Sequence, residues 1–197
     1  YGKYLTKKAD TLNEKLGYVI PYADSPFDHE NVGEEVYFHI LNHAKKYVHI
    51  MTPYLIIDQS MITALTFAAK RGVDVKLILP HIPDKKFVFA LAKSHYKELL
   101  KAGVRIYEYT PGFVHAKIFT SDDEKAVVGT INLDYRSLYL HFECAAFLYQ
   151  VEEIAEIEKD FQRTLEKCQE VTLENRKKGT FFLRLEGWLL KWLAPLM

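Results

Sequence analysis

A unit of helix and strand signals occurs twice in the middle of this 197-residue chain, and it restricts the fold more than any other feature. Gly72 and Gly103 are 31 residues apart, and so are Pro80 and Pro111. Each glycine follows a segment with helical periodicity, and a short apolar run leads from each glycine to the proline. Strands that alternate with helices through short connections form right-handed crossovers and pair in parallel. The repeat therefore predicts an α/β fold with a parallel sheet covered by helices.

Three apolar runs of strand length and three amphipathic segments make up this part of the chain. We expect strands in VHIMTPYL (48–55), VDVKLILP (73–80) and VRIYEYT (104–110). We expect helices at 34–47, from Asp58 to Gly72, and from Asp84 to Gly103. Asp58 is a typical N-cap residue, and Gly72 suits the left-handed position after a helix.

The pattern changes after Pro111. VHAKIFT (114–120) and AVVGTIN (126–132) are strand-like runs separated by the polar turn SDDEK, and CAAFLYQ (144–150) is a further short strand. These runs are typical of antiparallel additions to the same sheet. A helical segment begins at Val151. The expected architecture is a single domain over residues 1–197, with a mixed, mostly parallel sheet and helices on both faces.

The charge of the chain is balanced overall and uneven locally. Lys and Arg total 26, and Asp and Glu also total 26, so the formal net charge is zero. No overall positive field attracts nucleic acid, and we expect no nucleic-acid partner. Between Lys70 and Arg105, however, nine basic residues stand against three acidic ones. This excess indicates either solvated helix faces or a surface that meets anionic lipid headgroups.

Cysteine usage and hydropathy bear on the cellular setting. Cys144 and Cys168 are the only cysteines and form no CxxC, which favours a reducing compartment. No apolar run approaches the roughly 18 residues of a membrane span, so we expect this fragment to be soluble. The sequence begins at Tyr1 rather than at a methionine, and we interpret it as part of a longer protein, in which any membrane anchor could lie upstream.

The segment HAKIFTSDDEKAVVGTIN, from His115 to Asn132, concentrates reactive side chains. Alternate residues of a strand share a face, so His115 and Lys117 point together. Thr130 and Asn132 share a face on the returning strand in the same way. Gly129 permits close approach of a substrate or of a neighbouring chain. An imidazole, an ammonium and a carboxamide are thus predicted to converge on one small volume.

This set of groups fits chemistry at a phosphodiester. Imidazole changes protonation near neutral pH and can act as a nucleophile or an acid. Lys117 and Asn132 can stabilise phosphoryl oxygens as charge redistributes, without a metal or another cofactor. The histidine also needs a carboxylate to fix its tautomer, and either Glu143 or Asp122 can supply one.

The spacing of these residues resembles the HKD motif of the phospholipase D superfamily. The motif reads His115-x-Lys117-x4-Asp122-x6-Gly129-Thr130-x-Asn132. LDYRSLYLHFE (133–143), IMTPYLIID (50–58) and PHIPDKK (80–86) are similar to the carboxy-terminal half of bacterial cardiolipin synthases. The resemblance extends from about Tyr18 to the end of the chain and implies a phospholipase D-like α/β/α sandwich.

The resemblance also implies roles for individual residues. His115, Lys117 and Asp122 would be catalytic-motif residues, with Asp122 supporting the site structurally. Asn132 would bind phosphate, and Glu143 would orient an active-site histidine. The family usually has Asn two residues before that glutamate, whereas this chain has His141, whose role is left open.

The family requires two such motifs, and this sequence contains one. His43-Ala44-Lys45 lacks the later Asp and Gly-x-Asn and falls in an expected helix, so it is not a second motif. The missing motif comes either from an amino-terminal half of the same longer chain or from a homodimer partner. The detailed similarity and the absent initiator methionine favour the first. The isolated half is expected to be weakly active or inactive.

The activity implied by the resemblance is phosphatidyl transfer between two phosphatidylglycerol molecules through a phosphohistidine, giving cardiolipin and glycerol at a bacterial inner membrane. His115 is either the nucleophile or the general acid and base. Two alternatives are a homodimeric phosphodiesterase or nuclease, which zero net charge disfavours, and a non-catalytic module that binds anionic lipid.

Three further features have open interpretations. Tyr54, at the carboxyl end of the first strand, is either a substrate contact or a core or rim residue. His39 and His43 are four residues apart on a helix, but no third ligand is indicated, and we expect no metal site. Residues 180–197 place Arg184, Gly187 and Lys191 opposite an apolar face, which fits an interfacial amphipathic helix or a helix docked on protein.

Overall fold

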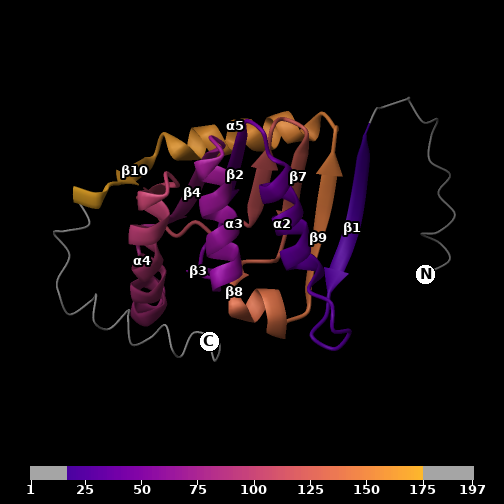
Figure 1. Ribbon diagram of the computed structural model, residues 1–197, viewed down its shortest axis with the longest axis horizontal. Coiled ribbons are helices and arrows are strands. Elements are labelled where there is room, and N and C mark those ends of the chain that lie inside the picture. The colour runs from indigo at the N-terminus through magenta and orange to yellow at the C-terminus, as the bar shows by residue number, and fades with distance from the viewer. Residues whose placement is uncertain (1–16, 175–197) are drawn as a thin grey trace, which may run out of the picture.

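The computed structural model describes residues 17–174 (Figure 1). An eight-stranded sheet in the order β1-β9-β7-β6-β2-β4-β5-β10 forms its centre, and β3 and β8 form a separate two-stranded pair. The strands are β1 (Tyr18–Asp24), β2 (Tyr47–Met51), β3 (Leu55–Ile56), β4 (Asp74–Pro80), β5 (Arg105–Tyr109), β6 (Ile118–Ser121), β7 (Lys125–Gly129), β8 (Leu133–Asp134), β9 (Glu143–Tyr149) and β10 (Cys168–Val171). The helices are α2 (Val32–His43), α3 (Gln59–Lys70), α4 (Lys86–Lys101), α5 (Glu153–Leu165) and the π-helical turn η1 (Arg136–Leu140).

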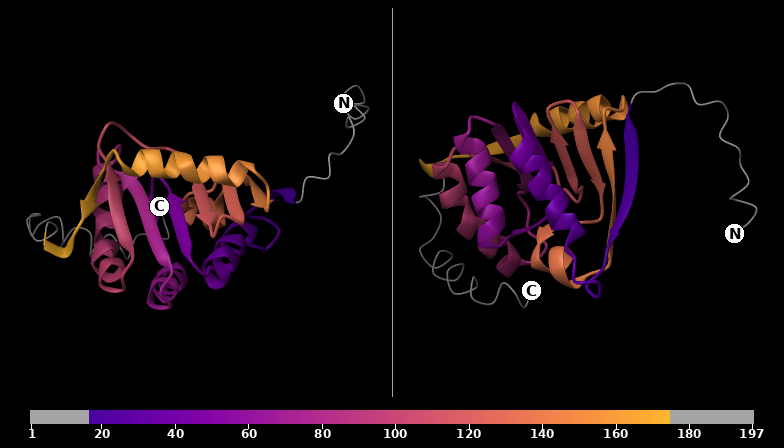
Figure 2. Two further views of the ribbon diagram at one scale, coloured as in Figure 1. Left: turned by 90° about the horizontal axis from the view of Figure 1, so that it is seen from above. Right: turned by 45° about the vertical axis from the view of Figure 1, so that its right-hand side comes forward.

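Helices cover both faces of the sheet. Helices α2, α3 and α4 lie side by side on one face, and α5 crosses the other (Figure 2). The predicted α/β/α sandwich is therefore confirmed. Strands β1, β2, β4, β5 and β7 run in one direction and the other three strands of the large sheet run against them, which confirms a mixed, mostly parallel sheet. Within the described part of the large sheet, the only parallel neighbouring pairs are β2–β4 and β4–β5. The parallel part therefore consists of the adjacent strands β2, β4 and β5.

The repeated unit forms the helices and strands that its signals predict. The Asp58 carboxylate accepts the Met61 N–H at 2.8 Å and begins α3. Gly72 and Gly103 follow α3 and α4 with φ of 92° and 98°, a conformation that costs glycine little. β4 and β5 then pair in parallel, as the repeat predicts.

The sequence analysis placed some strand boundaries wrongly. The strand predicted at 48–55 divides into β2 and β3, because Thr52 donates its N–H to the Ile78 carbonyl and Pro53 has no N–H to continue the ladder. β1 and β10 were not predicted. β1 contains Pro21 and is exposed along most of its length, as an edge strand tolerates. The helix expected at 180–197 lies outside the described residues.

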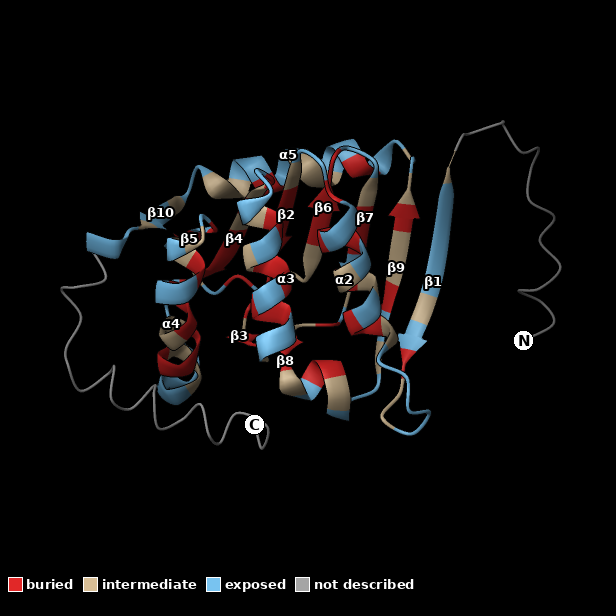
Figure 3. Cartoon of the chain, viewed as in Figure 1, coloured by how far each residue is buried: buried red, intermediate tan, exposed pale blue. Residues whose placement is uncertain are grey.

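The larger core lies between the sheet and α2–α4 (Figure 3). Tyr37 of α2 stacks on Phe119 of β6 with ring centroids 3.9 Å apart, so the helix is fixed directly over the central hairpin. A smaller core packs Phe161 of α5 against the opposite face. Phe161 stacks on His49, whose ring nitrogen Nδ1 lies 2.8 Å from Glu158. None of the helices within residues 17–174 combines the length and apolar character needed to cross a bilayer.

Asp122 joins the β6–β7 turn to the start of β2. Its carboxylate accepts three backbone N–H groups, from Lys45 at 2.7 Å, Lys46 at 2.8 Å and Tyr47 at 2.9 Å. Burial alone raises the pKa of Asp122, but these hydrogen bonds outweigh it and hold the pKa below the usual value. Asp122 is thus a structural anchor, as the resemblance implied.

We predict that Asp122→Asn lowers the free energy of unfolding by about 1–3 kcal/mol, because an amide cannot accept from all three backbone donors. Asn tolerates the positive φ of 57° at this position, so the substitution tests the carboxylate rather than the backbone. Asp123→Asn, at an exposed neighbour with φ of 59°, is the matched control and should cost less. Urea denaturation measures both, and equal losses would contradict the anchoring role.

The same contact sets a pH dependence. The pKa of Asp122 is lower in the folded protein than in the unfolded chain, where it is about 3.9. Its stabilising contribution is therefore present above that value and is lost as the pH falls through the folded-state pKa. The stability difference between wild type and Asp122→Asn should shrink as the pH is lowered from 6 towards about 3.

Candidate active site

The predicted site residues gather at the edge where β6 begins and β7 ends. His115 and Lys117 lie on an extended segment just before β6, and Thr130 and Asn132 just after β7, so the strands are shorter than predicted. β6 and β7 are antiparallel neighbours, which brings these two segments together. The Gly129 N–H donates to the Lys117 carbonyl at 3.4 Å and extends the pairing towards the site. The predicted convergence of the two segments is thus observed in the backbone.

His115 and Lys117 contact each other directly. Lys117 Nζ lies 3.1 Å from Nδ1 and 3.2 Å from Nε2 of His115, and donates to the His115 carbonyl at 2.7 Å. The ammonium therefore lies against the imidazole ring and the backbone of the same residue. The His115 side chain is exposed at the edge of the sheet and can be approached from solvent.

Two carboxylates face the Lys117 ammonium. Partial burial lowers the pKa of Lys117, and the negative charges of Glu143 and Asp134 oppose that shift. The sequence analysis did not single out Asp134, because an aspartate after a strand reads as an ordinary turn residue. In the structure it is buried, its Oδ1 accepts the Ser137 N–H at 2.8 Å, and burial raises its pKa above the usual value.

Glu143 contacts Thr130 and His141 within the described residues, rather than His115. Thr130 Oγ1 donates to Glu143, and Nδ1 of His141 lies 3.3 Å from Glu143 Oε1. The Glu143 side chain is only 8% exposed, so these contacts fix its position. The histidine that Glu143 contacts is therefore His141, the residue that departs from the family pattern, and the role of Glu143 in orienting an active-site histidine stays a prediction.

The alternative that Asp122 fixes the tautomer of His115 is wrong. Asp122 follows β6, whereas His115 precedes it, so the two residues lie at opposite ends of that strand. The carboxylate is also occupied by the backbone of residues 45–47. A residue that holds the hairpin from its far end cannot contact the imidazole.

Asn132 is held by the turn that follows it. Its Nδ2 donates to Ser137 Oγ at 3.0 Å, and Ser137 lies in η1. Its Oδ1 is buried and has no hydrogen-bond partner among residues 17–174. Asn132 shares the extended segment with Thr130 but makes its side-chain contact with η1, so its predicted phosphate contact stays a prediction.

Tyr54 lies at the rim of the site. Its hydroxyl donates to Asp84 Oδ2 at 2.6 Å, and its ring centroid is 6.2 Å from that of Phe113. Phe113 is in turn 6.0 Å from His115, so a row of three rings leads from Tyr54 to the catalytic motif. Tyr54 therefore occupies the rim position that was one of its predicted alternatives. A substrate contact by Tyr54 stays a prediction.

The space beside Gly129 is filled by β9. A Cβ atom at this position would lie 2.4 Å from both Ala145 Cβ and the Cys144 carbonyl oxygen. The close approach that Gly129 permits is therefore that of a neighbouring strand, which gives this glycine a packing role, and a contact with substrate stays a prediction.

Solved structures with the same fold define the class of protein. The chain superposes on Nuc, a phospholipase D family member from Salmonella typhimurium, with a TM-score of 0.66 and 16% identity, over 79% of this chain and 98% of that one. It superposes on the phosphatidylserine synthase of Haemophilus influenzae with a TM-score of 0.72 and 16% identity, over 98% of this chain and 50% of that one. These likenesses establish a phospholipase D-like fold.

Sequence comparison gives the family. The family described as "Cardiolipin synthase, PLD-like domain" matches residues 37–165. A cardiolipin synthase of Halalkalibacterium halodurans is 37% identical over 98% of this chain and 38% of its own length. An uncharacterized protein of Streptococcus mutans is 57% identical over 100% of this chain and 42% of its own length. The chain belongs to the cardiolipin synthase PLD-like family, and it spans about two fifths of the length of these curated relatives.

We predict that Gly129→Ala destabilises the protein by about 1–3 kcal/mol, the usual cost of overpacking. The added methyl must displace β9 or β7, so the extended segment with Thr130 and Asn132 shifts as well. Gly112→Ala is the matched control, because a Cβ there meets nothing within 4 Å. Thermal unfolding of both variants tests this, and a neutral Gly129→Ala would show that the strands have room to separate.

Proposed function

We propose that this chain is one catalytic half of a phospholipase D-type phosphatidyltransferase that makes cardiolipin. The observation that carries the proposal is the contact between His115 and Lys117 at an exposed edge, within a fold and family of this type. The donor is phosphatidylglycerol. A histidine nitrogen attacks phosphorus, the bond to the glycerol oxygen breaks, and glycerol leaves with a proton from a second histidine.

The second step regenerates the enzyme. The free hydroxyl of another phosphatidylglycerol gives its proton to a histidine and attacks the phosphohistidine, which releases cardiolipin and the free imidazole. His115 takes one of these two roles. The Lys117 ammonium, with the Asn132 amide, stabilises the phosphoryl oxygens while their charge changes.

A second histidine has to come from outside the described residues. His115 lies at an open edge, which leaves its outer side accessible to another motif. The length of the curated relatives supports a second motif in the same longer chain, and a homodimer is the alternative arrangement. The proposed location of the whole protein is the bacterial inner membrane, where the lipid substrates reside.

A nuclease or other phosphodiesterase activity is the second candidate, since Nuc shares the fold. The zero net charge of the chain opposes it, because binding to a nucleic-acid backbone depends on basic side chains. The intact His115 and Lys117 contact also disfavours a module that only binds anionic lipid.

We predict that His115→Ala, in a protein that carries this chain together with its second motif, lowers cardiolipin formation by a factor on the order of 10²–10⁴ or more. His43→Ala is the matched control, because His43-Ala44-Lys45 repeats the HAK tripeptide at the end of α2. Mass spectrometry of products from phosphatidylglycerol measures both variants. Cardiolipin formation that survives in His115→Ala would refute the assignment, and hydrolysis of DNA instead of lipid would favour the second candidate.

We predict that residues 1–197 alone, as a monomer, turn over phosphatidylglycerol at least about 100-fold more slowly than the two-motif protein, because one of the two proton-transfer groups is missing. Specific activity measured across protein concentrations, with the oligomeric state followed by light scattering, separates the two arrangements. Activity that rises with dimer formation indicates a homodimeric site, and a fully active monomer contradicts the need for a second motif.

A further inference from the structure

Large apolar side chains are exposed next to the catalytic motif. Ile82 is 51% exposed, Phe87 43% and Phe113 38%. Ile82 follows β4, Phe87 lies in the first turn of α4, and Phe113 lies between β5 and His115. The carboxyl ends of β4 and β5 therefore present these three side chains at the same edge as the site.

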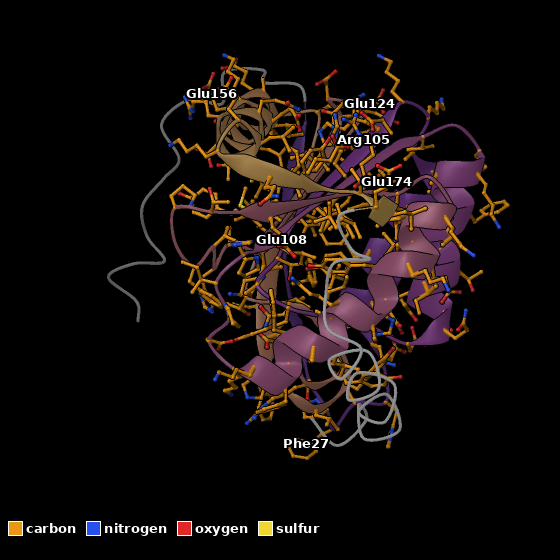
Figure 4. All side chains as sticks on the ribbon, turned by 90° about the vertical axis from the view of Figure 1, so that its left-hand side faces the viewer. Phe27, Arg105, Glu108, Glu124, Glu156 and Glu174 are labelled. Carbon is orange, nitrogen blue, oxygen red and sulfur yellow. The ribbon has the colours of Figure 1, made fainter. Side chains whose placement is uncertain are left out.

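Contacts confirm that these segments lie together in space. Pro83, Asp84 and Val88 line one small pocket with Phe113. The hydrogen bond from Tyr54 to Asp84 and the ring contact from Tyr54 to Phe113 cross the same pocket. Figure 4 shows Phe27, another exposed aromatic residue, at this end of the molecule, with Glu124 and Arg105 towards the other end.

The charges around these side chains are mainly positive. Lys85 and Lys86 are exposed between Ile82 and Phe87. The nearby carboxylates are engaged, because Asp84 accepts from the Tyr54 hydroxyl and from the Lys85 N–H, at 2.7 Å for the latter. Glu108 is buried and paired with His81 at 2.8 Å and with Lys93 at 3.3 Å. Asp84 is also exposed, so residues 81–87 carry two lysines against one aspartate, a formal net charge of +1.

We propose that Ile82, Lys85, Lys86, Phe87 and Phe113 form a docking surface for an anionic lipid bilayer. The proposal rests on the proposed function, because a histidine that acts on a lipid phosphate must meet the headgroup while the acyl chains stay in the bilayer. Apolar side chains that enter the interface and lysines that meet anionic headgroups together favour such a surface. Phe113 joins the surface to the site, since its ring lies 6.0 Å from His115.

A bilayer fits this surface better than a second protein domain. A protein interface leaves few lysines unpaired at its centre, whereas Lys85 and Lys86 stand between the two apolar residues of the segment. Each lysine gains from an anionic membrane without a fixed partner, because the surface potential acts over about 10 Å.

Co-sedimentation of the full chain with phosphatidylglycerol vesicles tests the contribution of the apolar side chains to membrane binding. Ile82→Ser combined with Phe87→Ser should weaken vesicle binding by about tenfold or more. Phe67→Ser is the matched control, because Phe67 is also an exposed aromatic residue, 53% exposed and in contact with Arg71. It lies near the C-terminal end of α3, outside the proposed surface. Equal binding of both variants and wild type overturns the proposal.

A second pair of variants tests the charge. Lys85→Gln with Lys86→Gln should weaken binding to phosphatidylglycerol vesicles, should leave the weaker binding to phosphatidylcholine vesicles unchanged, and should flatten the salt dependence. The control, Lys70→Gln with Lys101→Gln, removes two exposed lysines from the C-terminal ends of α3 and α4, whereas Lys86 begins α4. An equal effect of both pairs assigns binding to the wider basic region and overturns the proposed surface.

Two further readouts separate this proposal from its alternatives. A protein domain that covers the surface would give a different result. The Ile82→Ser, Phe87→Ser variant of the longer protein would then show a lower Tm or an altered oligomeric state. Its vesicle binding would be unchanged, and the proposal would fail. Vesicle binding is measured without turnover, so a two-motif protein that binds through this surface but makes no cardiolipin refutes the proposed function alone. In an active protein, the variant should lose activity on vesicles and keep it on a soluble short-chain phosphatidylglycerol.

Discussion

The hydrogen bonds from three backbone N–H groups to the Asp122 carboxylate are the constraint on which the site depends. They fix the far end of the β6–β7 hairpin to the start of β2, while the near end carries His115 and Lys117. The four residues between Lys117 and Asp122 are β6 itself, and a strand of that length spans about 13 Å. The spacing of the motif is therefore the length of a strand, and it places Asp122 at the opposite end of β6 from Lys117.

The parts of the fold that were predicted are those encoded by neighbouring residues. Gly72 and Gly103, the Asp58 cap and the apolar runs between them are local signals, and α3, β4, α4 and β5 form where they indicate. β1 and β10 depend on distant partners, since Tyr18 pairs with Tyr149 and Cys168 with Tyr109. β1 is interrupted by Pro21, and β10 is only four residues long, so neither carries a strong strand pattern. The same limit applies to the site: alternation predicted the His115 and Lys117 pair, whereas burial of Asp134 depends on packing that no local pattern encodes.

The electrostatics of the site support the proposal that a second motif completes it. The charges of Glu143 and Asp134 act on the Lys117 ammonium. Burial raises the pKa of Asp134 above its usual value. A phosphodiester carries a negative charge of its own, so this half offers it little net attraction. A second ammonium and a second histidine facing the same phosphate would reverse that balance, and the exposed position of His115 leaves room for them.

The zero net charge of the chain is also consistent with a substrate that is held in a membrane. An enzyme that captures a dissolved polyanion benefits from a positive field that acts over its whole surface, because the field raises the rate of encounter. A lipid is already concentrated in two dimensions, so an enzyme at the bilayer needs attraction only where it touches the headgroups. Lys85 and Lys86 supply that attraction at the edge that carries His115, while acidic residues such as Glu124 and Glu156 lie away from that edge (Figure 4). A local basic segment on a neutral chain is therefore a charge pattern that fits the proposed bilayer surface.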